Sequence, residues 1–165
     1  MAVSPMNAGP EFEKFAVGQP VSRLEDPMLL RGDGIYTDDV GLDGQAYAYV
    51  FRSSYAHGVI RTLDVSQATN APGVLTVLTA ADMDDVGANL LFCRTDKVSR
   101  DGSPMIKPDR PCLAKGKVRY RGEAIAVVVA ESIAEAKDAS ELIKLDIDVL
   151  PAVTDSREAL ADGAP

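Results

Sequence analysis

The sequence has no tryptophan, one histidine and two cysteines among its 165 residues. Cys93 and Cys112 are too few and too far apart for a metal-binding motif of the CxxC type. Aromatic residues make up only 5% of the chain, which leaves little for stacking against nucleic-acid bases or for an aromatic cage. These shortages argue against a cysteine-built metal motif and against an aromatic recognition site.

Long apolar runs and basic runs are also missing. No apolar stretch approaches the roughly 18 residues that a membrane-spanning helix needs. The first residues include Glu11 and Glu13 and show neither the basic nor the apolar region of a secretory signal. The formal net charge is −8 and the basic residues are scattered, which argues against a nucleic-acid-binding surface. We therefore predict a cytoplasmic protein without a membrane span, whose cysteines are reduced thiols.

The most informative stretch that is present covers residues 124–130, which are all apolar. Its large side chains are β-branched, and a short run of this kind is typical of a strand. A strand with no polar alternation must be covered on both faces, which places it at the centre of a sheet. Each of these large side chains contributes roughly 1.5–3 kcal/mol when it is buried. We expect the rest of the domain to be organised around this strand.

A helix is predicted directly afterwards, at about residues 132–144. Ser132 and Glu135 have the spacing of a capping box. Apolar residues recur at helical spacing and would form one buried stripe. The stripe consists of Ile133, Ala136, Ala139 and Leu142 or Ile143. Residues 145–149 then alternate between apolar and acidic, which predicts a half-buried strand. If this strand were a parallel neighbour of 124–130, the crossover would be right-handed.

The remaining chain is predicted to consist of short elements joined by irregular segments. Residues 1–17 would form a flexible N-terminal arm, and the charged stretch up to residue 43 would form turns and short extended pieces. Strands are expected at 45–52, 59–65 and 74–79. Helical turns are expected at 66–71, 80–83 and 156–161. Residues 84–117 form a long excursion, with short strands around 90–93 and 111–113.

The single histidine suggests one possible catalytic site. His57 follows Ser53 and Ser54 and precedes Asp64, so a Ser-His-Asp arrangement can be imagined. Such triads are normally assembled from segments that are distant in the sequence. A histidine at a strand end that bonds to the backbone is the simpler interpretation.

Three further groups have a functional and a structural interpretation. Gly32 and Gly34 lack the third glycine and the flanking strand and helix of a phosphate-binding loop, so a turn is expected. The acidic pairs at 38–39 and 84–85 could bind a hard cation, as in a metal hydrolase, or could be solvated loop carboxylates. The two cysteines could form a redox pair or be separate structural thiols. The residues alone therefore predict an α+β domain with no visible active site.

Several segments, taken in order, resemble the N-terminal part of the molybdenum-binding large subunit of the xanthine dehydrogenase/aldehyde oxidase family. They are RLEDP at 23–27, LRGDGIYTDD at 30–39, FRSSYAH at 51–57, APGV at 71–74, VRYRGE at 118–123, AVVVA at 126–130 and LPAV at 150–153. Similar bacterial proteins include large subunits of the carbon monoxide dehydrogenase and isoquinoline oxidoreductase types. The resemblance covers residues 18–165. It implies an α/β hammerhead domain, with a mixed β-sheet and one main packed helix at about 132–144.

The resemblance also implies a function for a much longer parent subunit, of which this chain would be the N-terminal structural domain. Enzymes of the family hydroxylate a heteroaromatic ring or an aldehyde with oxygen from water. Their cofactor is molybdenum on a pterin, commonly the cytosine dinucleotide form in bacteria, and 2Fe-2S and FAD modules carry the electrons away. The molybdopterin-binding loops and the catalytic glutamate lie C-terminal of the matched segment. No catalytic, cofactor-binding or metal-binding residue is therefore assigned in this chain.

The expected partners are the remaining domains of the large subunit and the iron–sulfur and FAD subunits. A packing surface toward them is predicted from the charged segment 23–39 together with 52–57. Its candidate residues are Arg23, Glu25, Asp26, Arg31, Tyr36, Asp38, Asp39, Arg52 and His57. The alternative is a standalone binding or scaffold module that has the same fold and no enzymatic activity.

Overall fold

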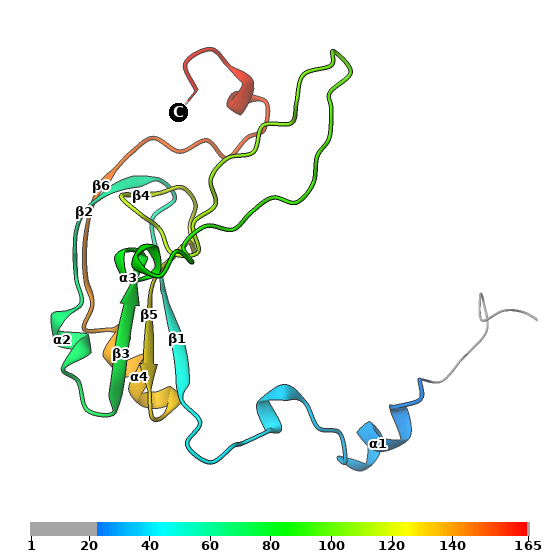
Figure 1. The fold of residues 1–165 in the computed structure, drawn as a ribbon, viewed down its shortest axis with the longest axis vertical. Helices are drawn as coiled ribbons and strands as arrows, with labels where there is room; N and C mark the ends of the chain where they lie inside the picture. The colour runs from blue at the N-terminus through cyan, green and yellow to red at the C-terminus, as the bar shows by residue number, and fades with distance from the viewer. Residues whose placement is uncertain (1–22, 165) are drawn as a thin grey trace, which may run out of the picture. The chain divides into compact units, whose positions relative to one another are not determined.

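The computed structural model describes residues 23–164, so the predicted arm at 1–17 lies outside the described residues. The chain divides into two compact units, residues 1–42 and residues 43–165, and each is described by itself. In the first unit, the helix α1 covers Asp26–Arg31 and the 3-10 helix η1 covers Thr37–Asp39 (Figure 1).

The prediction of turns and extended pieces for this stretch was wrong at α1. Pro27 lies in the first turn, where its fixed φ suits a helix and its missing N–H costs nothing. Gly32 ends the helix in the left-handed conformation, at φ 78°, and its N–H donates to the carbonyl of Leu29 at 3.1 Å. The start and stop signals of a helix were therefore present within a charged segment.

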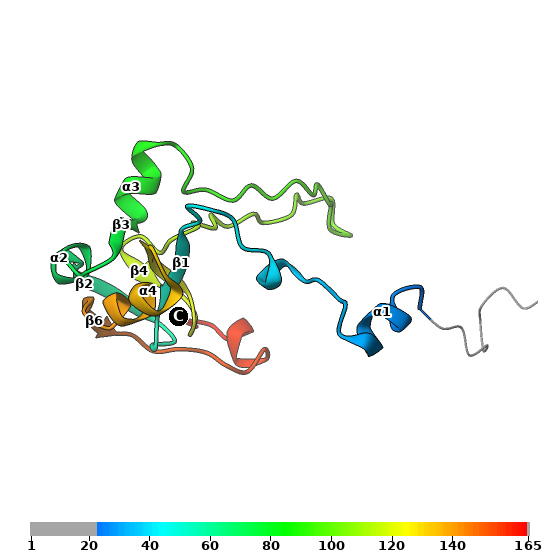
Figure 2. The same cartoon turned by 90° about the horizontal axis from the view of Figure 1, so that it is seen from below.

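The second unit contains all of the strands that the structure describes (Figure 1, Figure 2). Its elements are β1 (Tyr47–Arg52), β2 (Gly58–Asp64), α2 (Ser66–Thr69), β3 (Val74–Thr79), α3 (Ala80–Asp85), β4 (Lys117–Val118), β5 (Ala124–Ala130), α4 (Ile133–Ser140), β6 (Lys144–Val149) and the 3-10 helix η2 (Glu158–Leu160). They form two three-stranded sheets, with the strand orders β1-β5-β3 and β4-β2-β6. The predicted α+β class with one main packed helix is confirmed.

The single mixed sheet expected from the resemblance is instead two separate sheets, and all their strand pairs are antiparallel. β5 and β6 lie in different sheets, so no parallel crossover joins them. The 8-residue helix α4 connects them, and β6 pairs with β2 in the second sheet.

The sheet β1-β5-β3 packs one face against α4, and β5 is its central strand as predicted. Ala126, Val128 and Ala130 point to this side, and all three are fully buried. They pack in one cluster with Ala136 and Ala139 of the helix. The small alanines let the helix approach the sheet closely, so this face forms the main core.

The predicted cap of α4 is present, but the helix is shorter than predicted. The Glu135 N–H donates to Oγ of Ser132 at 3.2 Å, and the Ser132 hydroxyl donates to the Glu135 carboxylate at 2.8 Å. The helix ends at Ser140, because the Leu142 N–H bonds to the carbonyl of Ala139, three residues back, and tightens the last turn. Leu142 is 42% exposed, and Ile133, another predicted stripe residue, is 52% exposed.

The face of β5 that points away from α4 is covered only in part, which corrects the expectation of a strand hidden on both sides. Ile125 does not cover this face, because the register with β1 shifts there and its fully buried side chain packs with Val118 and Phe51 in a second core cluster next to the first. Val127 and Val129 are only half-buried. The second cluster lies between the two sheets at one end of β5, so it does not reach the other two valines.

β2 is the central strand of the second sheet and pairs with both β4 and β6. Gly58 is opposite Val118 on one side and Val149 on the other. A Cβ at Gly58 would lie 2.8 Å from the carbonyl oxygen of Asp148 and would collide with the side chain of Ile147. Only glycine therefore allows three strands to meet at this position.

The segment between α3 and β4 runs out from the body of the unit and returns (Figure 1, Figure 2). The short strands predicted at 90–93 and 111–113 are reduced to a single bridge, Leu90 with Pro111, and a second bridge joins Val98 with Pro104 farther along the segment. Proline lacks the N–H that would continue a ladder, which explains why neither bridge extends. The helix predicted at 156–161 is the 3-10 helix η2. No helix in residues 23–164 is long and apolar enough to cross a membrane.

Candidate functional site

His57 lies at the start of β2 and connects that strand to the segment that follows β6. Its Nδ1–H donates to the carbonyl of Pro151 at 2.6 Å, because a carbonyl oxygen can only accept. The His57 carbonyl in turn accepts the N–H of Leu150 at 3.0 Å. Two hydrogen bonds from one residue therefore attach residues 150–151 to the β1–β2 turn.

Ser53 is buried directly after β1, and its N–H, carbonyl and hydroxyl group all have hydrogen-bond partners in the protein. Its N–H donates to the carbonyl of Glu123 at 2.9 Å, and its carbonyl accepts the N–H of Gly122 at 2.8 Å. Its hydroxyl donates to the carbonyl of Tyr55 at 2.9 Å and accepts the Tyr55 N–H at 3.0 Å. This network shapes the turn that carries the chain from β1 toward His57.

These contacts decide between the two interpretations of the single histidine. His57 bonds to Pro151, Ser53 bonds to Tyr55, and Asp64 accepts the N–H of Ser66 at 3.0 Å. Hydrogen bonds from the hydroxyl group and the N–H of Ser66 lower the pKa of Asp64 below its ordinary value. None of these side chains bonds to another of the imagined triad, so the interpretation of His57 as a backbone-bonded residue is confirmed.

Glu123 is a structural residue that the motif analysis did not single out. Its side chain is buried, and its Oε2 accepts the N–H of Arg119 at 2.5 Å. Oε1 lies 3.9 Å from Nη1 of Arg119, so the guanidinium also faces the carboxylate. Arg52 donates from Nη1 to the carbonyl of Gly122 at 2.9 Å. Glu123 and Arg52 thus hold the loop before β5, and the sequence signal was an acidic residue directly before an apolar strand.

The predicted interface residues of the first unit mainly bind within their own segment. Asp26 accepts the N–H of Arg23 at 3.0 Å, and Asp39 accepts the N–H of Tyr36 at 2.9 Å. The Nε of Arg31 donates to the nearby Asp33 at 2.9 Å. Most of the predicted residues are exposed, namely Arg23, Glu25, Arg31, Tyr36, Asp38, Asp39 and Arg52, whereas Asp26 and His57 are half-buried. Their role in an interface stays a prediction.

One member of each acidic pair has a local partner, Asp39 at the Tyr36 N–H and Asp84 at Lys115, and the two cysteines are not bonded to each other. Oδ2 of Asp84 lies 2.5 Å from Nζ of Lys115, and this contact lowers the pKa of Asp84 below its ordinary value. Cys93 and Cys112 are free thiols, as the sequence analysis expected. Within residues 23–164, no group of three or more His, Cys, Asp or Glu side chains could hold a metal ion, so we assign no ligand to one.

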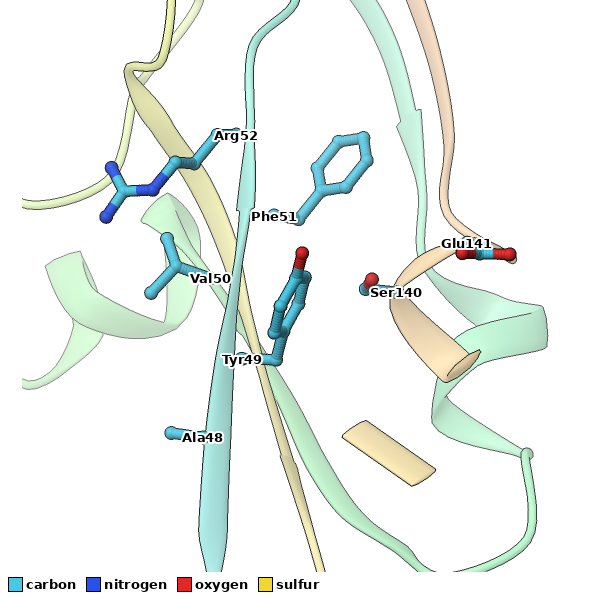
Figure 3. A pocket seen from close by; sticks show the side chains of 7 residues that line it. All are labelled: Ala48, Tyr49, Val50, Phe51, Arg52, Ser140 and Glu141. Carbon is cyan, nitrogen blue, oxygen red and sulfur yellow. The ribbon is translucent and has the colours of Figure 1, made fainter. Parts of the chain in front are cut away.

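A hollow follows the free edge of β1 beside the C-terminal end of α4. It is lined by Ala48, Tyr49, Val50, Phe51, Arg52, Ser140 and Glu141. Figure 3 shows Tyr49 and Phe51 pointing toward the helix end and Ala48, Val50 and Arg52 pointing to the other side of the sheet. β1 therefore presents a large aromatic face to α4 and, in the opposite direction, the small side chains of Ala48 and Val50 followed by Arg52 at its end.

With this geometry in place, the chain can be compared with known proteins. Residues 31–151 match the family model described as "Aldehyde oxidase and xanthine dehydrogenase, a/b hammerhead domain". The chain belongs to the aldehyde oxidase and xanthine dehydrogenase family. The predicted hammerhead fold is thereby confirmed, with two antiparallel sheets in place of one mixed sheet.

Relatives within this family are several times longer than the chain. It is 36% identical over 160 residues to the nicotine 6-hydroxylase large subunit of Paenarthrobacter nicotinovorans, covering 97% of this chain and 19% of the relative. It is 36% identical over 144 residues to the xanthine dehydrogenase molybdenum-binding subunit of Escherichia coli O157:H7, covering 86% and 18%. The chain therefore spans about a fifth of the length of the curated relatives it matches.

A solved structure of the family has the same fold over this segment. CO dehydrogenase from Oligotropha carboxidovorans, in a reconstituted form, superposes with a TM-score of 0.75 and 34% sequence identity. The match covers 90% of this chain and 17% of that chain. The elements described above therefore correspond to one hammerhead domain within a larger subunit of that enzyme.

Proposed function

We propose that the chain is the N-terminal structural domain of a molybdenum hydroxylase large subunit and is not catalytic by itself. The observation that carries this proposal is the hammerhead match at 31–151 in a chain that spans about a fifth of its relatives. One of those relatives is named as a molybdenum-binding subunit. The domain would supply a folded support, and the reaction would take place in the other parts of the subunit.

The reaction proposed for the parent enzyme is the hydroxylation of a heteroaromatic ring or an aldehyde. The cofactor, when bound, would supply the oxidation of the substrate with oxygen from water, and we expect molybdenum on a pterin in the cytosine dinucleotide form. Electrons would leave through 2Fe-2S and FAD modules on partner subunits, in the cytoplasm. The described residues do not bring together a ligand set for the metal, so no step of this reaction is assigned to them.

The contribution that we assign to this chain is positional. The hydrogen bonds of Ser53, His57 and Glu123 fix the β1–β2 turn, the loop before β5 and the segment after β6. Charged side chains at 23–39 and at 52–57 would pack against the cofactor domains and the iron–sulfur subunit. Buried networks whose polar atoms are all bonded stiffen the backbone that carries them, which suits a support that must keep its neighbours in place.

The test compares the 165-residue chain with the complete gene product, prepared with its partner subunits. Molybdenum content is measured by mass spectrometry, and turnover is measured with aldehydes and N-heteroaromatic compounds and an artificial electron acceptor. We expect molybdenum and turnover in the complete preparation and neither in the short chain. Turnover by the short chain alone would overturn the non-catalytic role. A complete gene product of only 165 residues would instead favour the standalone binding module.

A further inference from the structure

The face of the β1-β5-β3 sheet that points away from α4 is here called the open face. It consists of Ala48, Val50, Thr76, Leu78, Val127 and Val129. The strand register brings these residues together, because Val127 lies between Val50 and Leu78, and Val129 lies between Ala48 and Thr76. Figure 3 shows Ala48 and Val50 on the side of β1 opposite to the aromatic side chains that face α4.

The chemistry of the open face is unlike that of a sheet surface in water. Charged residues make up 25% of the chain, yet none of the residues of the open face is charged. An antiparallel sheet with one solvated face normally alternates apolar residues inside with polar residues outside. Here the outward positions are apolar except for Thr76 in β3 and Arg52 at the end of β1. The composition is that of a face meant to be covered.

The elements described for the second unit leave this face only partly covered. α4 contacts all three strands, whereas α3 makes its main sheet contacts with β3 alone. Val127 and Val129 of β5 are half-buried, and Ala48 and Thr76 are exposed. Residues of the open face belong neither to the two buried core clusters nor to the side chains that pack against them. The sheet therefore has a complete layer on one side and an incomplete one on the other.

We propose that the open face is the docking face for another domain of the same large subunit, which would bring an apolar surface of its own. This inference rests on the proposed function. The curated relatives have about four fifths of their length outside the segment that matches this chain, so the covering polypeptide has an evident source. Contacts between mobile domains are polar, whereas interfaces that stay closed resemble a domain core in composition. An uncharged, β-branched face fits that kind of contact.

A second copy of this chain is the competing occupant, and the charge argues against it. The chain carries a formal net charge of −8, so two copies brought face to face would repel each other. Arg52 points to the same side of β1 as the open face, as Figure 3 shows. The open face therefore borders the segment 52–57 that the sequence analysis assigned to a packing surface, and the two would form one continuous docking area.

Cysteine labelling tests which polypeptide covers the open face. Thr76→Cys and Ala48→Cys place a thiol at exposed positions on it, and Asp138→Cys places a control thiol on the exposed side of α4. Each variant is made in the 165-residue chain, in the complete large subunit alone and in the complete enzyme with its partner subunits, and is treated with a maleimide. Protection that appears only when the partner subunits are present would assign the face to them and would overturn the inference. Mass spectrometry of the labelled peptides separates the new thiols from Cys93 and Cys112, and melting temperatures confirm folding.

We expect Thr76→Cys and Ala48→Cys to be labelled quickly in the short chain and at least about tenfold more slowly in the complete large subunit, alone or with its partner subunits, with Asp138→Cys labelled in all three preparations. Equal labelling of the open face in all three would overturn the inference. Protection in the short chain that disappears on dilution, together with a dimer mass by light scattering, would show a second copy and would overturn it too.

The molybdenum content and turnover of the same preparations keep the two proposals apart. An active molybdenum enzyme whose open face is labelled contradicts only the docking inference. A protected face in a complete product without molybdenum contradicts only the proposed function.

Discussion

Val127 and Val128 are neighbours on β5 that point to opposite faces of the sheet, so the same substitution at both positions tests the layer structure. Val128 is fully buried in the cluster beneath α4, whereas Val127 is half-buried on the open face. Threonine has nearly the shape of valine and a similar preference for strands. Val128→Thr and Val127→Thr therefore add a hydroxyl group to each face while leaving no cavity behind.

The structure predicts different costs for the two changes. At Val128 the new hydroxyl group would be surrounded by Val77, Ala136 and Ala139, which offer no side-chain partner. A buried polar group without a hydrogen bond costs about 1–3 kcal/mol. At Val127 the hydroxyl group can reach water in the isolated chain, and we expect a loss below about 0.5 kcal/mol.

The assay is urea unfolding of the 165-residue chain, followed by circular dichroism. With a slope of about 2 kcal/mol per molar urea, a loss of about 2 kcal/mol lowers the midpoint by about 1 M. We expect that shift for Val128→Thr and almost none for Val127→Thr. Equal shifts would refute the assignment of one closed and one open face. In the same series, Val128→Asp should not fold, because an unpaired carboxylate cannot be accommodated in this core, whereas Val127→Asp should fold.

Three further predictions concern the turns and caps around the core. Gly73→Ala should destabilise the chain by about 1 kcal/mol or more, since Gly73 has a φ of 71° and a Cβ there would collide with the Glu135 carboxylate; an unchanged urea midpoint would contradict this. Ser132→Ala removes the cap of α4 and should cost about 1 kcal/mol in the same assay, whereas Ser132→Thr keeps a hydroxyl group that can accept from the Glu135 N–H and donate to its carboxylate, and should retain most of the stability. The pKa of Asp82 is lowered by hydrogen bonds from the hydroxyl and N–H of Thr79, so its stabilising effect is present above the unfolded pKa of about 3.9 and is lost as the pH falls through the lower folded value. The melting temperature of Asp82→Asn should therefore decline less than that of the wild type below about pH 4, and parallel curves would argue against this role.

The sequence predicts elements well where the signal is local. β3 begins directly after Pro72-Gly73, and β5 is an apolar run that ends before Glu131. The cap of α4 follows from the spacing of Ser132 and Glu135. α1 was missed because the charges around it suggested a surface loop, although Pro27 and Gly32 mark its two ends. In that segment local backbone chemistry determined the structure, and the lack of apolar residues was misleading.

The division into two sheets was not predictable from local patterns. It depends on contacts between distant segments, such as Gly58 meeting both Val118 and Val149. The partial exposure of Val127 and Val129 in β5 was not predictable either. An apolar run indicates that a strand is covered, but it does not show which part of the polypeptide covers it. In the candidate site, the residue type was predictable from the sequence, but its bonding partners were not. His57 stood out as the only histidine, but its partner Pro151 and the role of Glu123 depend on backbone atoms that the sequence pattern does not display.

The double attachment of His57 has a consequence for how the chain continues after β6. Because the imidazole and the carbonyl of one residue hold two successive residues, 150 and 151, this stretch cannot swing away from the sheet without breaking both bonds. A free linker would explore a wide cone of directions, and ordering it later would cost conformational entropy. Here that entropy is already lost when the domain folds. The direction in which the polypeptide leaves β6 is therefore fixed by the fold of the domain itself.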